Sequence, residues 1–134
     1  MKIKNHNITY TLPDCLIVGA AKSGTTALYK FLEEYDEVFC PNLKEPWFFS
    51  HMNESFKYVH PITKEDLSRQ LVTNINEYCS LFNEAKDNQL ILEASTSYLY
   101  TSDKVISNMK EIYGDKSKDV KIIAILRNIY KVLI

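Results

Sequence analysis

The sequence predicts an α/β protein in which helices flank a parallel sheet. Three short apolar segments, at residues 15–18, 90–92 and 120–126, have the length and composition of buried strands. Stretches with apolar residues at helical spacing lie between these segments. Strands that alternate with helices in this way indicate βαβ units, which place the strands parallel to one another.

The first strand–helix unit is expected within residues 15–40. Its strand ends at Gly19, and a helix is expected from Thr25. One face of this helix is predicted to be buried, because apolar residues recur on it at helical spacing. That face consists of Ala27, Leu28, Phe31, Leu32 and Tyr35, with Lys30, Glu33 and Glu34 outside it. A short extended piece at residues 38–40 follows.

The middle of the chain is expected to hold a loop and then two helices. Residues 50–62 carry scattered aromatic and turn-forming residues and predict a loop. A helix is expected from about Thr63, because Thr63 and Asp66 suit the first turn of a helix. A second helix is predicted over residues 74–85, where apolar side chains again recur at helical spacing.

The last part of the chain repeats the strand–helix pattern. The strand at residues 90–92 is followed by a predicted loop at 93–97 and by a helical stripe over 105–113. Gly114 suits the C-terminal cap of that helix, and the final strand is predicted over 120–126.

The residues best suited to bind a ligand follow the ends of the predicted strands. Lys22, residues 95–97 and Arg127 each follow the end of a predicted strand. Ligands of parallel sheets bind beyond the carboxyl ends of the strands. We therefore expect these three positions to meet at one edge of the sheet.

The connection between the first strand and the first helix is suited to a phosphate group. Residues 17–28 read IVGAAKSGTTAL. The first N–H groups of a helix are unpaired and the helix dipole is positive there, and Lys22 adds a full charge. A nucleotide triphosphatase loop reads G-x-x-x-x-G-K-S/T, whereas Thr25 here takes the place of that lysine after Gly24. The loop is therefore P-loop-like, but it is not arranged for Mg-ATP.

Four segments of the chain, taken in order, resemble one known family. They are residues 22–29 (KSGTTALY), 44–49 (KEPWFF), 92–99 (LEASTSYL) and 121–128 (KIIAILRN). The first looks like the 5′-phosphosulfate-binding loop of sulfotransferases that use 3′-phosphoadenosine 5′-phosphosulfate (PAPS) as donor. The second and third are similar to the K-E-P-x-F-F and G-E-A-S-P-S-Y-L segments of the branch that holds heparan-sulfate and bacterial carbohydrate sulfotransferases. The fourth looks like the strand and Arg that open the family's 3′-phosphate site.

The resemblance implies a sulfotransferase fold with PAPS as co-substrate, 3′-phosphoadenosine 5′-phosphate (PAP) as product, and no metal. It assigns Lys22 to the 5′-phosphate and the leaving oxygen, and Arg127 to the 3′-phosphate, whose oxygens suit a planar guanidinium. The remaining donor-binding candidates are Ser23, Gly24, Thr25 and Thr26. The alternatives are a solvated surface Lys22, an ordinary helix cap and a structural ion pair of Arg127.

Glu45 is the candidate catalytic base. The family places an acidic residue of the K-E-P-x-F-F segment near the acceptor, and the aromatic residues 47–49 are expected to wall the site off from water. The alternative is an ion pair of Glu45 with Lys44 or Lys22. His51 is the second candidate, because histidine is the common base near neutral pH.

The role of the third segment, residues 92–99, stays open. Some family members place a second catalytic Lys after the Glu that matches Glu93, whereas this chain has Ala94, as the bacterial proteins do. Glu93 and residues 95–97 either line the acceptor side of the site or cap a loop.

Composition excludes several other classes of function. The net charge is −1, so bulk charge gives no reason to expect a nucleic-acid or membrane partner. Three cysteines without metal-binding spacing predict reduced thiols. Residues 1–11 lack the apolar stretch of a signal peptide, and no apolar run is long enough to span a bilayer. We expect a cytoplasmic protein with a small-molecule or carbohydrate acceptor; the oligomeric state stays open.

The resemblance covers residues 12–128, but sulfotransferase domains of this branch are generally longer. Ile129 stands where the family has a Pro, and the family's 3′-phosphate Ser would fall past Ile134. Residues 1–134 are therefore expected to be a single, partial sulfotransferase domain. The rival interpretations are an inactive or nucleotide-binding fragment and a P-loop nucleotide kinase or NTPase. The missing Lys after Gly24 counts against the latter.

Overall fold

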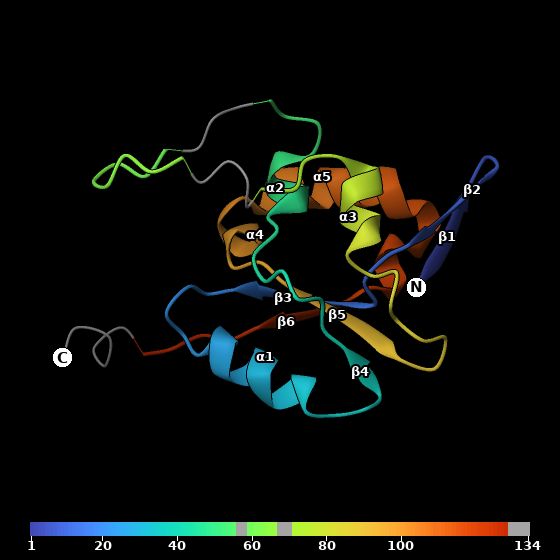
Figure 1. Ribbon diagram of the computed structural model, residues 1–134, viewed down its shortest axis with the longest axis horizontal. Coiled ribbons are helices and arrows are strands. Elements are labelled where there is room, and N and C mark those ends of the chain that lie inside the picture. Colours follow the sequence, from blue (N-terminus) through green and yellow to red (C-terminus); the bar gives the residue numbers. More distant parts are fainter. Residues whose placement is uncertain (56–58, 67–70, 129–134) are drawn as a thin grey trace.

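A central four-stranded parallel sheet organises the chain, in the order β4-β5-β3-β6. Its strands are β3 (Cys15–Gly19), β4 (Val38–Phe39), β5 (Leu90–Ala94) and β6 (Lys121–Ala124). The computed structural model describes residues 1–55, 59–66 and 71–128. The predicted fold class is confirmed, because helices cover both faces of this sheet (Figure 1).

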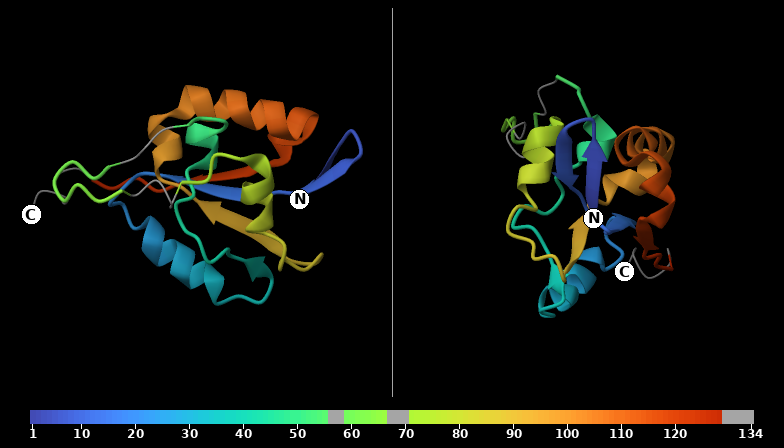
Figure 2. Two further views of the ribbon diagram at one scale, coloured as in Figure 1. Left: turned by 45° about the horizontal axis from the view of Figure 1, so that its top comes forward. Right: turned by 90° about the vertical axis from the view of Figure 1, so that its right-hand side faces the viewer.

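The helices are divided unequally between the two faces. Helix α1 (Thr25–Glu33) lies alone on one face (Figures 1 and 2). The other face is covered by α2 (Phe48–His51), α3 (Ile75–Ser80), α4 (Ser97–Tyr100) and α5 (Ser102–Tyr113). A 3₁₀ segment, η2 (Gly114–Asp119), leads from α5 into β6. No helix in the described ranges is long and apolar enough to cross a membrane.

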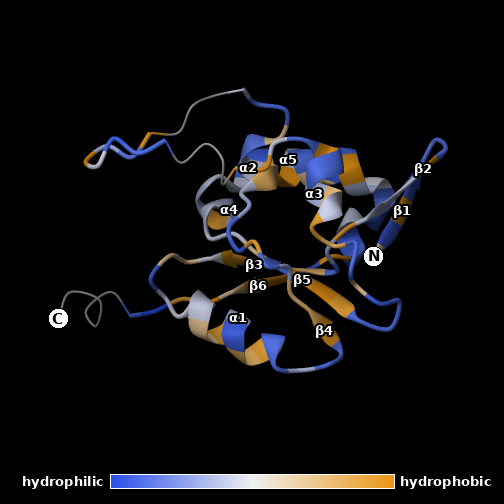
Figure 3. Ribbon diagram, in the orientation of Figure 1, coloured by the Kyte–Doolittle hydropathy of each residue, from blue (hydrophilic) through white to orange (hydrophobic). Residues whose placement is uncertain are grey.

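Strand β3 lies at the centre of the sheet, and all five of its residues are buried. Alternate side chains of a strand point to opposite faces. Leu16 and Val18 accordingly join the larger core beneath α2–α5, whereas Cys15 and Ile17 join the smaller core beneath α1. Figure 3 shows the central strands as predominantly apolar, in keeping with a sheet covered on both sides.

Stacked aromatic rings form the centre of the larger core. The Phe48 and Tyr78 rings stack with centroids 4.1 Å apart, and Phe49 meets Tyr78 edge-on at 5.4 Å. Offset and edge-to-face pairs of this kind add about 0.5–1.5 kcal/mol each beyond the area they bury. They join the short helices α2 and α3, which are too short to be stable alone.

Helix α1 is rotated relative to the sequence prediction. Phe31 and Tyr35, which were expected inside, are 54% and 48% exposed, whereas Thr25 and Tyr29 are buried. The Tyr29 hydroxyl donates a hydrogen bond to the carbonyl of Pro41 at 2.8 Å. The apolar pattern missed this face because a tyrosine can bury its ring when its hydroxyl finds a partner.

Several other predicted elements have different bounds. Residues 50–62 were expected to be loop, but α2 ends within them at His51. The helix predicted from Thr63 is wrong over residues 63–66, since Val59 and Asp66 form an antiparallel bridge; residues 67–70 lie outside the described part. The helix predicted over 74–85 is confirmed only as α3, and the strand predicted over 120–126 ends at Ala124.

A hairpin that the sequence analysis did not predict precedes the main sheet. Strand β1 (Lys2–Asn5) pairs antiparallel with β2 (Ile8–Thr11), at the end of the sheet opposite the connection from β3 to α1 (Figure 1). Only Ile3 of its eight strand residues is buried, although Ile8 and Tyr10 alternate with threonines along β2. Gly114, by contrast, ends α5 with a positive φ of 57°, and its prediction as a helix cap is confirmed.

Candidate functional site

The connection between β3 and α1, residues 19–25, is a backbone loop fixed at its first residues; we call it the phosphate loop. Ala20 N–H donates to the Ile125 carbonyl, and Ile125 N–H donates to the Gly19 carbonyl, each at 2.8 Å. Lys22 has a left-handed φ of 61°, and its side chain is exposed. The loop is thus held at the sheet while its one ammonium group extends into solvent.

The N-terminus of α1 leaves its first N–H groups without a side-chain cap. The N-cap is Gly24, whose φ of 101° is left-handed and which has no side chain that could accept from them. Thr25 is buried, Ser23 is half-buried and Thr26 is exposed. Unpaired N–H groups, the positive end of the helix dipole and Lys22 together make this loop a candidate anion site.

Gly19 brings the phosphate loop into close contact with the β5–α4 turn. A Cβ atom placed on Gly19 would lie 3.0 Å from Leu99 Cβ and 3.3 Å from the Thr96 carbonyl oxygen. Ser95 N–H also donates to the Ile17 carbonyl at 3.0 Å. The structure therefore brings the loop and residues 95–97 together, as their places at strand ends predicted.

Glu45 lies on the other side of the same turn. Its Oε2 accepts from Thr96 N–H at 2.8 Å, from the Thr96 hydroxyl at 3.4 Å and from the Trp47 indole N–H at 2.9 Å. Its Oε1 accepts from Lys44 Nζ at 3.0 Å. Thr96 thus donates to Glu45 and lies beside Gly19, so the turn that holds the candidate base packs against the first residue of the phosphate loop.

Of the three aromatic residues predicted to wall off the site, the structure brings only Trp47 to Glu45. Phe48 and Phe49 are completely buried in the larger core, where they pack against Tyr78 rather than line the site. Trp47 has a left-handed φ of 56° as the N-cap of α2, and this backbone turn directs its indole to Glu45. The two phenylalanines therefore anchor α2, and the tryptophan serves the site.

His51 is held in a pair with a carboxylate. Its Nδ1 lies 2.9 Å from Glu54 Oε2, and the other oxygen of Glu54 pairs with Lys104. Burial, with a smaller effect from the Lys104 ammonium, lowers the pKa of His51 below its ordinary value, so the imidazole is neutral at neutral pH. The His51 and Trp47 ring centroids are 6.3 Å apart, which places the second candidate base beside the tryptophan that donates to the first.

Glu93 is not a loop residue but lies in the core at the end of β5. Its side chain is completely buried, and both the Tyr78 and Tyr98 hydroxyls donate to its Oε2 at 2.8 Å. Its Oε1 has no hydrogen-bond partner in the described part of the chain. Burial is the main cause that raises the pKa of Glu93 to about 7. Sequence reasoning missed this, because nothing in the local pattern shows that α3 and α4 close over the residue.

The Ser95 side chain caps the start of α2. Its hydroxyl accepts from Trp47 N–H at 3.1 Å, which satisfies a backbone donor at the start of α2. Arg127 is exposed and follows Ile125, the residue that pairs with the phosphate loop, so it emerges at the same edge of the sheet. The prediction about Ile129 lies outside the described residues.

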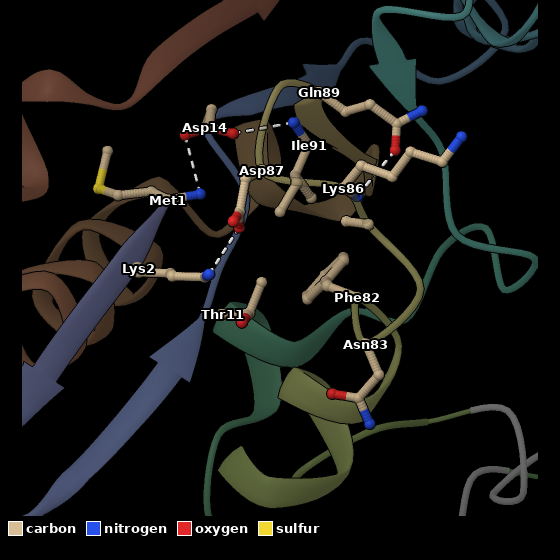
Figure 4. Close-up of a pocket in the computed structure, with 11 residues that line it drawn as sticks. Met1, Lys2, Thr11, Asp14, Phe82, Asn83, Lys86, Asp87, Gln89 and Ile91 are labelled. Carbon is tan, nitrogen blue, oxygen red and sulfur yellow. Dashed lines mark hydrogen bonds and ion pairs between the residues drawn. The ribbon is translucent and has the colours of Figure 1, made fainter.

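A cavity of 540 Å³ lies at the opposite end of the sheet, near the N-terminal hairpin (Figure 4). Four of its charged groups form two ion pairs: the Met1 ammonium with Asp14 at 2.8 Å, and Lys2 with Asp87 at 2.6 Å. Ligands of a parallel sheet bind at the carboxyl ends of the strands, and this cavity is at the other ends. We therefore place the candidate site at the phosphate loop.

Metal ligands do not gather at this site. Among the residues that the structure describes, no group of three His, Cys, Asp or Glu side chains is placed to hold a metal ion. The cysteines, Cys15, Cys40 and Cys79, are free thiols. Cationic and backbone N–H groups are thus what the site offers an anionic ligand.

Comparison with known proteins was made against families, curated proteins and solved structures. The family model of the sulfotransferase domain matches residues 12–134. A crystal structure of a sulfotransferase from Alicyclobacillus acidocaldarius is similar, with a TM-score of 0.68 and 28% sequence identity. The similarity covers 85% of this chain and 44% of that one, so the chain spans less than half of its structural relative. No curated protein matches the chain.

Proposed function

The chain belongs to the sulfotransferase domain family, and we propose that it transfers a sulfuryl group from PAPS to a hydroxyl or amine of a carbohydrate or another small acceptor. The observation that carries this proposal is the contact of Thr96 with both the phosphate loop and Glu45. That contact puts an anion-binding loop and a candidate base on either side of one turn. Residues 1–134 would then be one part of a sulfotransferase domain of the heparan-sulfate and bacterial carbohydrate branch.

The phosphate loop would hold the 5′-phosphosulfate of the donor. The unpaired N–H groups at the start of α1 and the hydroxyls of Ser23, Thr25 and Thr26 would donate to the phosphate oxygens. Negative charge grows on the oxygen between phosphorus and sulfur as their bond breaks, and Lys22 would stabilise it. Arg127, on the same sheet edge, would bind the 3′-phosphate.

Glu45 would take the proton of the acceptor. Three hydrogen bonds to Oε2 fix the carboxylate, whereas Lys44 supplies the one hydrogen bond that Oε1 accepts within the described residues. We therefore assign proton transfer to Oε1. The acceptor oxygen or nitrogen forms a bond to sulfur, the bond from sulfur to the bridging oxygen breaks, and PAP leaves.

A titration with PAP and with Mg-ATP tests the donor assignment. We expect PAP to bind without metal, and Lys22→Ala to weaken this binding about 10- to 100-fold, as expected when a charge-assisted hydrogen bond worth about 1.5–3 kcal/mol is lost. Lys30→Ala is the matched control, since Lys30 is an exposed lysine of α1 that pairs with Glu33.

The other interpretations give different results in the same titration. Preference for Mg-ATP would support a nucleotide kinase, and no binding at all would support an inert fragment. Equal PAP affinity in Lys22→Ala and the wild type would exclude the proposed role of Lys22. For the acceptor side, Glu45→Gln is expected to keep PAP binding but to abolish sulfate transfer from PAPS to a panel of sugar hydroxyls and amines.

A further inference from the structure

Glu93 is a buried carboxyl group without a role in the transfer step described above. Burying an ionisable group costs free energy, so its hydrogen bonds indicate what the buried position is used for. Its Oε2 accepts from Tyr78 of α3 and from Tyr98 of α4, each at 2.8 Å. Two helices that cover the sheet are therefore fixed to one carboxyl oxygen.

Tyr98 links Glu93 to α2 by hydrogen bonds. Its hydroxyl donates to Glu93 and accepts from Phe49 N–H at 3.3 Å. A hydroxyl has one hydrogen, so the carboxyl oxygen sets the direction of that hydrogen and leaves the lone pairs for Phe49. The Phe49 N–H belongs to the first turn of α2, where backbone donors need partners from outside the helix.

The first turn of α2 also determines where Trp47 and Glu45 lie. Trp47 is the N-cap of α2, and its backbone N–H is held by the Ser95 hydroxyl at 3.1 Å. Its indole N–H donates to Glu45 Oε2 at 2.9 Å. A shift of this turn would move the indole away from the carboxylate, and with it the candidate base.

We propose that Glu93 is a positioning residue of the site, which through Tyr98 holds the first turn of α2 and so keeps the Trp47–Glu45 pair beside the phosphate loop. This inference deepens the proposed function and rests on it for the role of Glu45. Glu93 itself is buried and does not touch the reacting groups. It acts on the site by holding α2.

The charge of Glu45 acts on the buried carboxyl group of Glu93. Burial raises the pKa of Glu93 to about 7, the hydroxyls of Ser95, Tyr98 and Tyr78 oppose this rise, and the negative charge of Glu45 adds to it. Two further tyrosines are close enough for the charge of Glu93 to act on them, Tyr113 of α5 in the same core and Tyr29 of α1 on the other face of the sheet, and burial raises the pKa of both, so both are neutral. Glu93 therefore changes its charge near neutral pH and senses Glu45.

Trp47 provides the measurement, because it is the one tryptophan in the sequence. Its fluorescence is recorded without ligand from about pH 5 to pH 9, a range that spans the titration expected of Glu93. We expect a transition with a midpoint near pH 7, the pKa of Glu93. Glu93→Gln keeps an oxygen that accepts from the tyrosines but cannot ionise, so the transition should disappear.

Two further variants separate positioning from simple packing. Glu45→Gln removes a charge that raises the pKa of Glu93, so the midpoint should move to lower pH. His51→Gln is the control for the neighbouring imidazole, whose pKa is lowered, and it should leave the transition in place. If Glu93 only stabilised the fold, its variants would change thermal stability, but the midpoint of the Trp47 transition would not change in Glu45→Gln. An unmoved midpoint in Glu45→Gln, or a transition that persists in Glu93→Gln, overturns the proposal.

The test remains decisive if Glu93→Gln does not fold. Tyr98→Phe keeps the ring but removes the hydroxyl through which Glu93 holds the first turn of α2, so the transition at Trp47 should be lost; a transition that persists unchanged overturns the proposal. A PAP titration of the wild type, done separately, tests the proposed function. Failure to bind PAP together with a Glu93-dependent transition would refute the donor assignment and leave the positioning role of Glu93 intact.

Discussion

Gly19→Ala is expected to destabilise the protein and to displace the phosphate loop. The new Cβ would lie 3.0 Å from Leu99 Cβ, 3.2 Å from Leu99 Cδ2 and 3.3 Å from the Thr96 carbonyl oxygen. Two of these neighbours, a backbone oxygen and a Cβ, cannot move without moving the β5–α4 turn. Gly19 also has a φ of +149°, which side-chain-bearing residues rarely adopt.

The size of the effect follows from these two causes. A residue held in an unfavourable backbone conformation costs about 1–3 kcal/mol, and overpacking of a close-packed site costs about 1–3 kcal/mol more. We therefore expect the free energy of unfolding to fall by about 2–6 kcal/mol. For a domain of this size each kcal/mol lowers Tm by about 3–5 °C.

Urea unfolding and PAP binding of Gly19→Ala are compared with those of Gly24→Ala. Gly24 also has a left-handed φ, +101°, but nothing lies within 4 Å of the position of its Cβ, so Gly24→Ala shows the cost of backbone strain alone. Gly114→Ala, with a φ of +57° and equally open space, is a second control away from the loop. A loss of stability in Gly19→Ala no larger than in Gly24→Ala would refute the packing argument.

Two further predictions concern stability. Asn74→Ala should lower the free energy of unfolding by about 1 kcal/mol, measured in urea, because the Asn74 side chain caps α3 by accepting from Asn76 and Glu77 N–H groups; Asn74→Asp, which retains the acceptor, should restore it. Glu93 has a pKa of about 7 in the folded protein and 4.5 as its ordinary value, so it binds its proton more tightly when folded. Its stabilising contribution should be complete below about pH 4.5 and lost as pH rises to about 7, with a total on the order of 3 kcal/mol. Urea unfolding at several pH values should show this decline in the wild type but not in Glu93→Gln, and equal declines in both would contradict it.

The strand–helix order and the phosphate loop were predictable because both depend on short stretches of sequence. Residues 15–18 are apolar and end at a glycine, and Thr25 opens a helix directly after Gly24, as the structure confirms. The cap at Gly114 was predictable for the same reason, since a left-handed residue after a helix favours glycine. These features need no knowledge of distant segments.

The errors occurred where a partner distant in sequence decides the outcome. Tyr29 faces inward because the carbonyl of Pro41 accepts from its hydroxyl, and α2 exists because Tyr98 and Ser95 hold its first N–H groups. Short helices of this kind are set by tertiary contacts rather than by propensity. The local pattern therefore placed Leu28 and Leu32 of α1 correctly against the core, but it missed Tyr29, put Phe31 inside and did not predict α2.

The sequence by itself determined the parallel α/β architecture, the anion-binding loop with Lys22 and the likeness to sulfotransferases, because spacing along the chain encodes each of them. Only the tertiary structure decided that Thr96 lies between Gly19 and Glu45, that Phe48 and Phe49 belong to the core, and that Glu93 is buried beneath two tyrosines. The physical reason is that a side chain's burial, hydrogen-bond partners and pKa depend on which distant segments the sheet brings against it.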